Sequence, residues 1–252
     1  MARRKGGDLE RAWRRAATLA PEHALALPFA RERVVAVGSG ASLAIARAYA
    51  ALREDGGHGP TDAFPPDELP RRDWDRSVLL SRRGDEPELV DALHRLRADA
   101  VLAIAIGAPA GSPVDELAGV TVPLEPAPGP GDEDAAYATT ALAVLRAHLA
   151  DDTPDDAGGR AAASALAAAL PDVGGVRRSL LLGHRGSLGL AEAAARSLRA
   201  AGADASAGPV SELIAGTLGE AGDGTLVWSF AEPDDAVRGW ADGGGAALRA
   251  PS

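Results

Sequence analysis

One local pattern occurs twice in this chain of 252 residues, and it restricts the fold more than any other feature. The short apolar run 34–37 ends in the loop G-S-G-A-S, and a helical pattern follows at once. The second half repeats this order, because the apolar run 179–182 is followed by G-H-R-G-S-L-G-L-A-E. Aligned without a gap, the two stretches share the pairs Gly38 and Gly183, Ser42 and Ser187, Leu43 and Leu188, and Ala46 and Ala191. An internal repeat of this kind predicts two copies of one strand–helix architecture.

Strand and helix patterns alternate along the whole chain. In the first half the expected strands are 34–37, 61–64, 77–80, 101–106 and 120–124, and in the second half they are 179–182 and 225–230. The expected helices are 8–20, 41–53, 88–97, 132–150 and 160–170. Short apolar strands that alternate with amphipathic helices are typical of parallel sheets covered on both faces. The sequence therefore predicts an α/β fold with two flavodoxin-like or Rossmann-like subdomains, each layered as helix, sheet and helix.

The acidic stretch D-D-T-P-D-D-A-G-G, residues 151–159, is the clearest domain boundary. We expect an N-terminal helix in 1–29, a first domain in 30–150, a linker and helix in 151–172, and a second domain in 173–252. No fourth or fifth strand is expected after Trp240, and the tail 243–252 is expected to be mobile. A truncated, three-stranded second half would leave a sheet edge and an apolar face exposed. This predicts a homodimer with the second half at or near the interface.

Composition excludes several classes of site and partner. The chain has no cysteine, so disulfides and thiolate chemistry are absent. Its formal charge of −10 argues against general nucleic-acid binding. The histidines show no metal-ligand spacing, and neither a metal nor a cofactor is expected. No apolar stretch has the length of a membrane span, and the basic N-terminus lacks the apolar core of a signal peptide. We therefore expect a cytoplasmic protein without membrane contact.

The loops that follow the strands are the expected ligand sites, because open parallel sheets bind ligands beyond the carboxyl ends of their strands. The three candidates are residues 38–42, 81–86 and 183–187. In the first loop Gly38 and Gly40 permit close approach of the backbone, and Ser39 and Ser42 add hydroxyl groups. A helix N-terminus supplies N–H groups and a partial positive charge. This combination suits a phosphate monoester.

This loop has three other interpretations. A dinucleotide site needs G-x-G-x-x-G, but the third glycine position is Leu43, and only Asp62 is a candidate for the acidic ribose ligand. A purely structural turn, as in any α/β domain, is the second interpretation. A serine hydrolase is disfavoured because no G-x-S-x-G elbow is present.

As a whole, the pattern resembles the double-domain form of the sugar isomerase (SIS) family, which includes the isomerase half of glucosamine-6-phosphate synthase. The family's first motif, G-x-G-x-S, is met by Gly38, Gly40 and Ser42. Its second motif, S-x-S-G-x-[ST], is met by Ser81 and Gly84 only. Three further stretches match motifs of the family more weakly: Glu133 with A-T-T at 138–140, Glu192 to Arg196, and E-L-x-x-G from Glu212 to Gly216. The resemblance covers about residues 30 to 230 and implies a phosphosugar ligand.

The second motif departs from the family at two positions. Where the resemblance implies hydroxyls that hold the phosphate, this chain has Arg83 and Glu86. Arg82 and Arg83 are candidates to clamp a phosphate through charge-assisted hydrogen bonds. Glu86 would repel a dianion at short range or form a salt bridge with an arginine. The alternative is that both arginines are solvated surface residues.

The catalytic groups that the resemblance implies are incomplete. Glu192 is the best match for the base, although the ungapped repeat places it one residue early, about 100° around a helix. Ala215 stands where the family has a histidine, and the single lysine of the chain is Lys5. His184 is a second acid–base candidate after a strand, with a surface histidine as the alternative.

Three functions remain open on the sequence. The first is a phosphosugar isomerase, with Glu192 in a pocket shared with Ser42 and Ser81. The second is a sugar-phosphate sensor or regulatory subunit that has lost the catalytic groups. The third is a structural remnant without a ligand.

Overall fold

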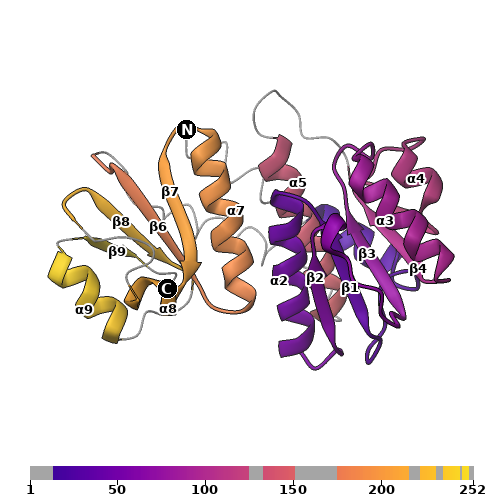
Figure 1. Cartoon of the computed structure of the whole chain (residues 1–252), viewed down its shortest axis with the longest axis horizontal. Coiled ribbons are helices and arrows are strands. Elements are labelled where there is room, and N and C mark those ends of the chain that lie inside the picture. The colour runs from indigo at the N-terminus through magenta and orange to yellow at the C-terminus, as the bar shows by residue number, and fades with distance from the viewer. Residues whose placement is uncertain are drawn as a thin grey trace. The chain divides into compact units, whose positions relative to one another are not determined.

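The computed structural model describes residues 14–124, 133–150, 175–215, 222–230, 235–244 and 246–249. The chain forms two compact units, residues 1–164 and 165–252 (Figure 1). The expected linker and helix 151–172 and the expected helix start at Asp8 lie outside the described residues. Among the described residues, none of the helices is long and apolar enough to cross a membrane.

The first unit contains a five-stranded parallel sheet in the order β2-β1-β3-β4-β5. Its strands are β1 (Val34–Gly38), β2 (Thr61–Phe64), β3 (Arg76–Leu80), β4 (Leu102–Ile106) and β5 (Val120–Val122). All five expected strands are present, with ends that differ from the expected ones by at most two residues. The central strands consist almost wholly of buried apolar residues, as parallel strands covered on both faces require.

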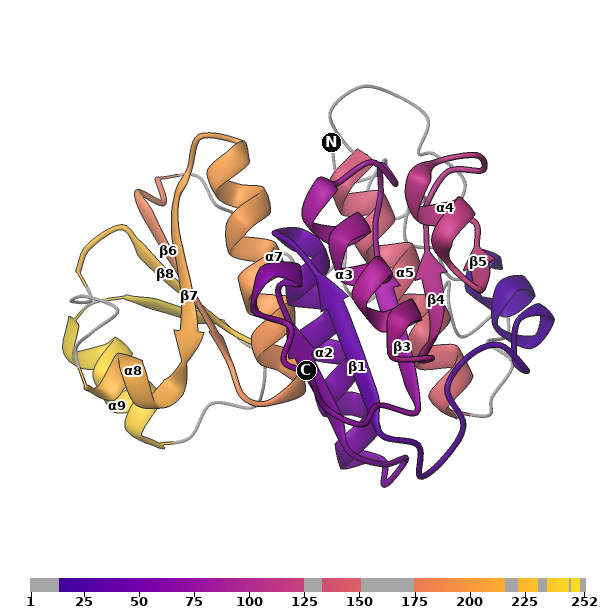
Figure 2. The same cartoon turned by 45° about the vertical axis from the view of Figure 1, so that its right-hand side comes forward.

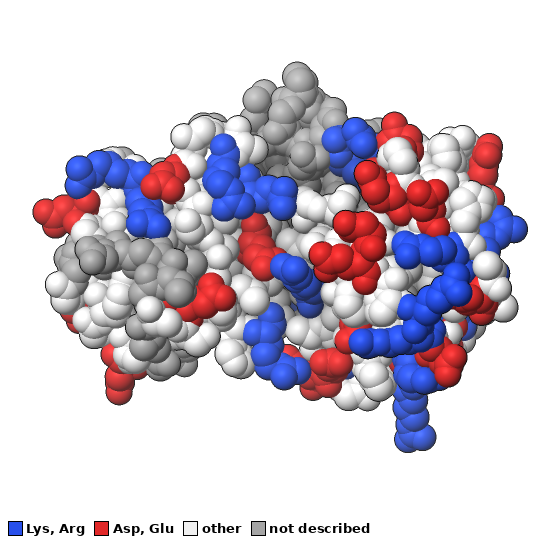
Figure 3. Space-filling view, viewed as in Figure 1, with Lys and Arg blue, Asp and Glu red and all other residues white. Residues whose placement is uncertain are grey.

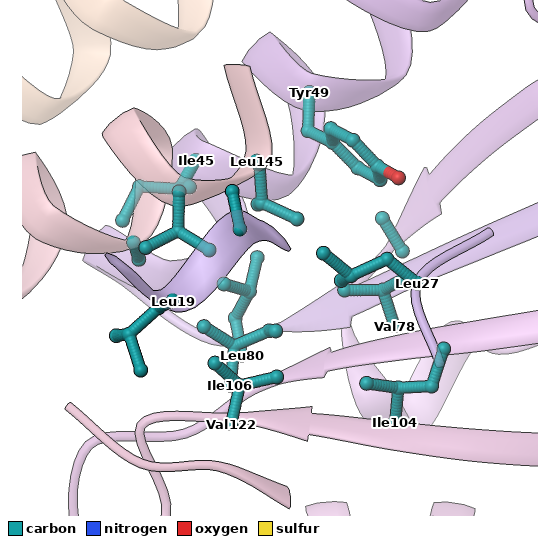
Figure 4. Packing of buried hydrophobic residues seen from close by; sticks show 14 of the residues in the cluster. Leu19, Leu27, Ile45, Tyr49, Val78, Leu80, Ile104, Ile106, Val122 and Leu145 are labelled. Atoms are coloured by element: carbon teal, nitrogen blue, oxygen red, sulfur yellow. The ribbon is translucent and has the colours of Figure 1, made fainter. Parts of the chain in front are cut away.

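Helices cover both faces of this sheet (Figure 2). The helices of the first unit are 14–22, α2 (Ala41–Asp55), α3 (Pro87–Ala98), α4 (Pro113–Leu117) and α5 (Glu133–Ala150), with the 3-10 turn η1 (Pro66–Glu68). Val34 and Ala36 face α2, α5 and helix 14–22, whereas Val35 and Val37 face α3 and α4. Figure 4 shows the first of these clusters, in which leucine, isoleucine and valine side chains fill the space between the helices and one face of the sheet. The expected layering of helix, sheet and helix is therefore confirmed in this unit.

A fully buried arginine joins the start of the first unit to its sheet. Arg53 of α2 is 0% exposed and donates to Thr61 Oγ1 at 2.9 Å. It also donates to backbone carbonyls, namely those of Pro28, Phe29, Glu32 and His58. The planar guanidinium thus satisfies carbonyls from loops that have no strand partner.

The second unit contains a four-stranded parallel sheet in the order β7-β6-β8-β9. Its elements are β6 (Arg178–Gly183), α7 (Gly186–Ala200), β7 (Asp204–Pro209), α8 (Val210–Ile214), β8 (Thr225–Ser229), α9 (Asp235–Gly244) and β9 (Ala247–Arg249). Leu181 packs with Ala191 and Ala195 of α7 on one face, and Leu180 and Leu182 pack with α8 and α9 on the other.

Two expectations for the second unit are wrong. A fourth strand, β9, follows Trp240 and lies inside the tail that was expected to be mobile. The apolar face that was expected to be exposed is covered by α8 and α9, because Leu213 and Val237 are fully buried against it. The homodimer stays a prediction, but a bare sheet face no longer supports it.

Candidate functional site

The β1 and β3 loops lie next to each other at the carboxyl edge of the first sheet. We define the β1 loop as residues 38–42 and the β3 loop as residues 81–86. β1 and β3 are hydrogen-bonded neighbours, with Gly38 in register with Leu80. The chain leaves β1 toward β2 on one side, and β3 lies on the other, so the two loops flank the point where strand order reverses. This is the position at which doubly wound sheets bind ligands.

The β1 loop turns tightly into α2. Gly40 has φ 60° and ψ −120°, a conformation that glycine adopts most easily. A Cβ on Gly38 would lie 2.8 Å from the carbonyl carbon and the Cβ of Ser42, so the turn also requires glycine there. Ser39 is exposed and Ser42 is partly buried. The first turn of α2 contains no acidic residue, so the positive end of this helix is uncompensated by its own side chains.

The β3 loop is closed by hydrogen bonds of its own. Ser81 is 0% exposed, and its hydroxyl donates to Glu86 Oε2 at 2.6 Å. The same hydroxyl accepts from the backbone N–H of Gly84 at 2.8 Å. Gly84 has φ 76°, and a Cβ there would lie 2.1 Å from Ser112 Oγ. The loop is therefore shaped by Ser81, Gly84 and Glu86 together.

The two candidate arginines differ in their surroundings. Arg83 forms an ion pair with Asp85 at 3.3 Å, and both side chains are more than half exposed, at 60% and 63%. Arg82 is partly buried, and its charge partly opposes the rise in the pKa of the Tyr137 phenol that burial causes. Arg82 is therefore within electrostatic range of Tyr137 in α5, whereas Arg83 pairs within the exposed surface.

Tyr137 is a residue of this region that the sequence interpretation missed. Its hydroxyl donates to the carbonyl of Ile106 at 3.2 Å. Burial raises the pKa of the phenol far above its usual value, a hydrogen bond with Ser42 lowers it, and the charge of Glu86 raises it. The Ile106 carbonyl also accepts from the Ser81 N–H at 3.2 Å, so the phenol lies beside the first residue of the β3 loop. The A-T-T segment at 138–140 marked this stretch of helix, but nothing in the pattern singled out its neighbour.

In the second unit, the loop before α7 reproduces the turn of the β1 loop. Arg185 has φ 46° and ψ −115°, close to the values of Gly40 at the equivalent position. The N–H of Ser187 donates to the carbonyl of His184 at 3.0 Å, as that of Ser42 does to Ser39. The Ser187 hydroxyl also bonds to the backbone of His184, as donor to the carbonyl and acceptor from the N–H. The repeat read from the sequence is therefore matched by the backbone.

The two catalytic candidates both belong to the second unit. His184 is exposed in the loop before α7. Glu192 is partly buried in α7, six residues beyond its first residue, which is about 9 Å along the helix axis. A shared pocket of Glu192 with Ser42 and Ser81 stays a prediction, because these residues belong to different units.

Two further surface features bear on the location of a site. A pocket of about 370 Å³ lies at the amino ends of β4 and β5, the opposite edge of the first sheet from the loops, and is lined by Arg97, Ala100, Val101, Leu102, Ala103, Glu116, Leu117, Ala118 and Gly119. Within the described residues, no group of three or more histidine or carboxylate side chains is arranged to hold a metal ion. On the face in Figure 3, acidic and basic side chains are interspersed.

Comparison with known proteins gives similarity in structure without close similarity in sequence. No family model and no curated protein matches the chain. Glucosamine-6-phosphate deaminase from Thermotoga maritima has a TM-score of 0.73 at 16% identity, over 98% of this chain and 84% of that one. Tagatose-6-phosphate ketose/aldose isomerase from Escherichia coli has a TM-score of 0.68 at 21% identity, over 95% of this chain and 75% of that one.

A third similar structure is the C-terminal domain of glucosamine-fructose-6-phosphate aminotransferase from Francisella tularensis. Its TM-score is 0.65 at 12% identity, over 98% of this chain and 80% of that one. At sequence identities this low, the structural similarity shows the fold and does not determine the activity. The comparisons agree with the resemblance read from the motifs, and the chain therefore has the fold of the SIS-type phosphosugar isomerases.

Proposed function

We propose that this protein binds a sugar phosphate at the β1 and β3 loops of the first unit. The observation that carries the proposal is the register of Gly38 with Leu80, which brings two serine-bearing loops together where strand order reverses. The similar structures include proteins named for sugar phosphates, which supports this ligand class.

The β1 loop is the proposed position of the phosphoryl group. It combines the N-terminus of the 15-residue helix α2, the hydroxyls of Ser39 and Ser42, and a first turn without acidic residues. Backbone N–H groups and the helix dipole there favour an anion. Arg82, whose charge acts on the Tyr137 phenol, would contribute positive charge.

Whether the bound sugar is converted defines two versions of the proposal. As an isomerase, the protein would use Glu192 as the base that moves a proton between C1 and C2. As a sensor or regulatory subunit, it would bind without turnover. Ala215 at the family's histidine position and the lack of any lysine after Lys5 favour the sensor.

A two-step experiment tests the proposal. First, the melting temperature is measured with the 6-phosphates of glucose, fructose and glucosamine and with the three parent sugars. Ligands that bind the folded state raise this temperature, so a rise with at least one 6-phosphate is expected. No rise with any of the six compounds, each in excess at millimolar concentrations, would refute the proposed function.

The second step separates enzyme from sensor. Exchange of the C2 proton with solvent deuterium is followed for the best binder with wild type, Glu192→Gln and the control Asp242→Asn, an exposed carboxylate of α9. An isomerase should show exchange that falls about 100-fold or more in Glu192→Gln alone, as expected for loss of a general base. Binding without exchange would assign the sensor.

A further inference from the structure

The β3 loop already contains an anion of its own. The fully buried Ser81 hydroxyl donates its one proton to Glu86 Oε2 at 2.6 Å. The Gly84 N–H, which points to the same hydroxyl at 2.8 Å, is used within the loop as well. Donors that would otherwise be available to a phosphoryl group therefore serve the Glu86 carboxylate and the turn.

The two loops differ in charge at the helices that follow them. α3 begins with Glu86 as its N-cap and has Glu88 in its first turn, so its positive end faces acidic side chains. α2 has no acidic residue in its first turn. A dianion is thus attracted to the start of α2 and repelled at the start of α3, where a hydroxyl or an ammonium group would be attracted.

The arginines do not reverse this contrast. Arg83 is paired with Asp85 at 3.3 Å on the exposed side of the loop. Glu86 is hydrogen-bonded to Ser81, which directly follows Leu80, and Leu80 is in register with Gly38, so the Glu86 carboxylate lies at the sheet edge beside the β1 loop. A ligand seated at the β1 loop would meet the Glu86 carboxylate.

We propose that Glu86 determines the specificity of this site: its carboxylate accepts a hydrogen bond from a hydroxyl or amino group of the sugar, while the phosphoryl group lies at the β1 loop. The inference rests on the proposed function and names the orientation of the ligand. A carboxylate has about four acceptor positions, and the Ser81 hydroxyl occupies one of them. Ser81 acts as a positioning residue, because its buried hydroxyl holds the carboxylate in place.

The test measures dissociation constants of the three 6-phosphates and their parent sugars for wild type, Glu86→Gln and Glu88→Gln. Glu86→Gln keeps an oxygen that accepts from Ser81 but removes the charge. Glu88→Gln removes the same charge from an exposed position on the same helix. The melting temperature of each unliganded variant is recorded, so that a folding defect is separated from a binding defect.

The expected result is that Glu86→Gln weakens binding of each sugar by about five- to tenfold, because a neutral acceptor replaces a charged one, and weakens binding of its 6-phosphate by a smaller factor, because repulsion of the phosphoryl group is also relieved. Glu88→Gln should change neither. If Glu86→Gln instead binds the 6-phosphates more tightly than wild type does, the phosphoryl group lies at the β3 loop and the inference is wrong. Unchanged affinities for Glu86→Gln would also overturn it, and both of these outcomes leave the proposed function standing. Failure of wild type to bind any of the six compounds refutes the proposed function itself.

Discussion

At the scale of single residues, the equivalent turns before α2 and α7 carry different amounts of backbone strain. Gly40 and Arg185 share nearly the same positive φ, but only glycine adopts this conformation without steric cost. Arg185→Gly is therefore expected to raise the free energy of unfolding by about 1 kcal/mol. Urea denaturation measures this free energy. The control is Arg196→Gly in the interior of α7, which should lower the free energy of unfolding by about 1 kcal/mol. Equal destabilisation by both changes would show that Arg185 is unstrained.

Both tyrosines of the chain are buried, which predicts an unusual alkaline titration. Burial raises the pKa of Tyr49 to about 12, against a smaller lowering by the charge of Arg53. Burial also raises the pKa of Tyr137. The folded protein should therefore show almost no tyrosinate absorbance at pH 10, where half of an exposed tyrosine is ionised.

The same shift has a consequence for stability. Between pH 10 and about 12 the unfolded chain loses the Tyr49 proton while the folded chain keeps it, so the unfolded state binds fewer protons. Tyr49 therefore does not lower the free energy of unfolding below pH 10, and this free energy falls as the pH rises from 10 toward 12. Tyr49→Phe should flatten this dependence in urea denaturation at pH 9 to 11. Half-ionised tyrosine in the folded protein at pH 10 would contradict both statements.

At the scale of elements, Arg53 connects α2, β2 and the segment that precedes β1. Its removal would leave the buried Thr61 hydroxyl without its Arg53 donor and the carbonyls of Pro28, Phe29, Glu32 and His58 without its N–H groups. Arg53→Met is expected to lower the free energy of unfolding by about 3 kcal/mol or more, because buried carbonyls lose their donors. Arg47→Met, on the exposed side of α2, should change it by about 0.5 kcal/mol or less. Similar values for the two variants in chemical denaturation would remove the assigned role of Arg53.

The last strand gives a second prediction at this scale. β9 pairs with β8 through Leu226 with Ala247 and Val227 with Leu248, and Leu248 packs on the cluster of Leu180, Leu182 and Val237. A chain that ends at Gly245 should therefore have a lower melting temperature than the full chain. An unchanged melting temperature by calorimetry would favour the dispensable tail that the sequence predicts.

The elements that the sequence predicted well are those with complete apolar patterns. β1 is a buried apolar run, β3 ends in the buried apolar run 78–80, and the expected strands and helices of the first unit lie close to their predicted bounds. β7, D-A-S-A-G-P, and β9, A-L-R, were missed, because neither contains an apolar run long enough to mark a strand. Their pairing with β6 and β8 is a tertiary effect that no local pattern contains.

The site was predictable in outline only. Glycine and serine after a strand indicate a ligand loop, so the β1 loop and the β3 loop could be located from motifs. The hydrogen bond from Ser81 to Glu86 and the contact of Tyr137 with Ser42 depend on side chains brought together by folding. The different surroundings of Arg82 and Arg83, adjacent in sequence, also follow only from the backbone of the loop.

At the scale of the whole molecule, the central claim is that the ligand binds at the carboxyl edge of the first sheet. The pocket at the amino ends of β4 and β5 offers a competing location with a volume of about 370 Å³. It is lined by apolar and backbone groups together with Arg97 and Glu116, and it lies away from both serine loops. Volume alone does not decide between the two edges, because a sugar phosphate is recognised by directed polar groups.

The measurement that tests this claim most directly is a map of backbone amide chemical shifts during titration with the 6-phosphate that stabilises the protein most. The account predicts shifts concentrated at Gly38 to Ser42 and at Ser81 to Glu86, and their loss with Gly38→Ala, whose Cβ would clash with Ser42. Shifts concentrated instead at residues 97–103 and 116–119 would place the ligand at the opposite edge of the sheet and contradict the account.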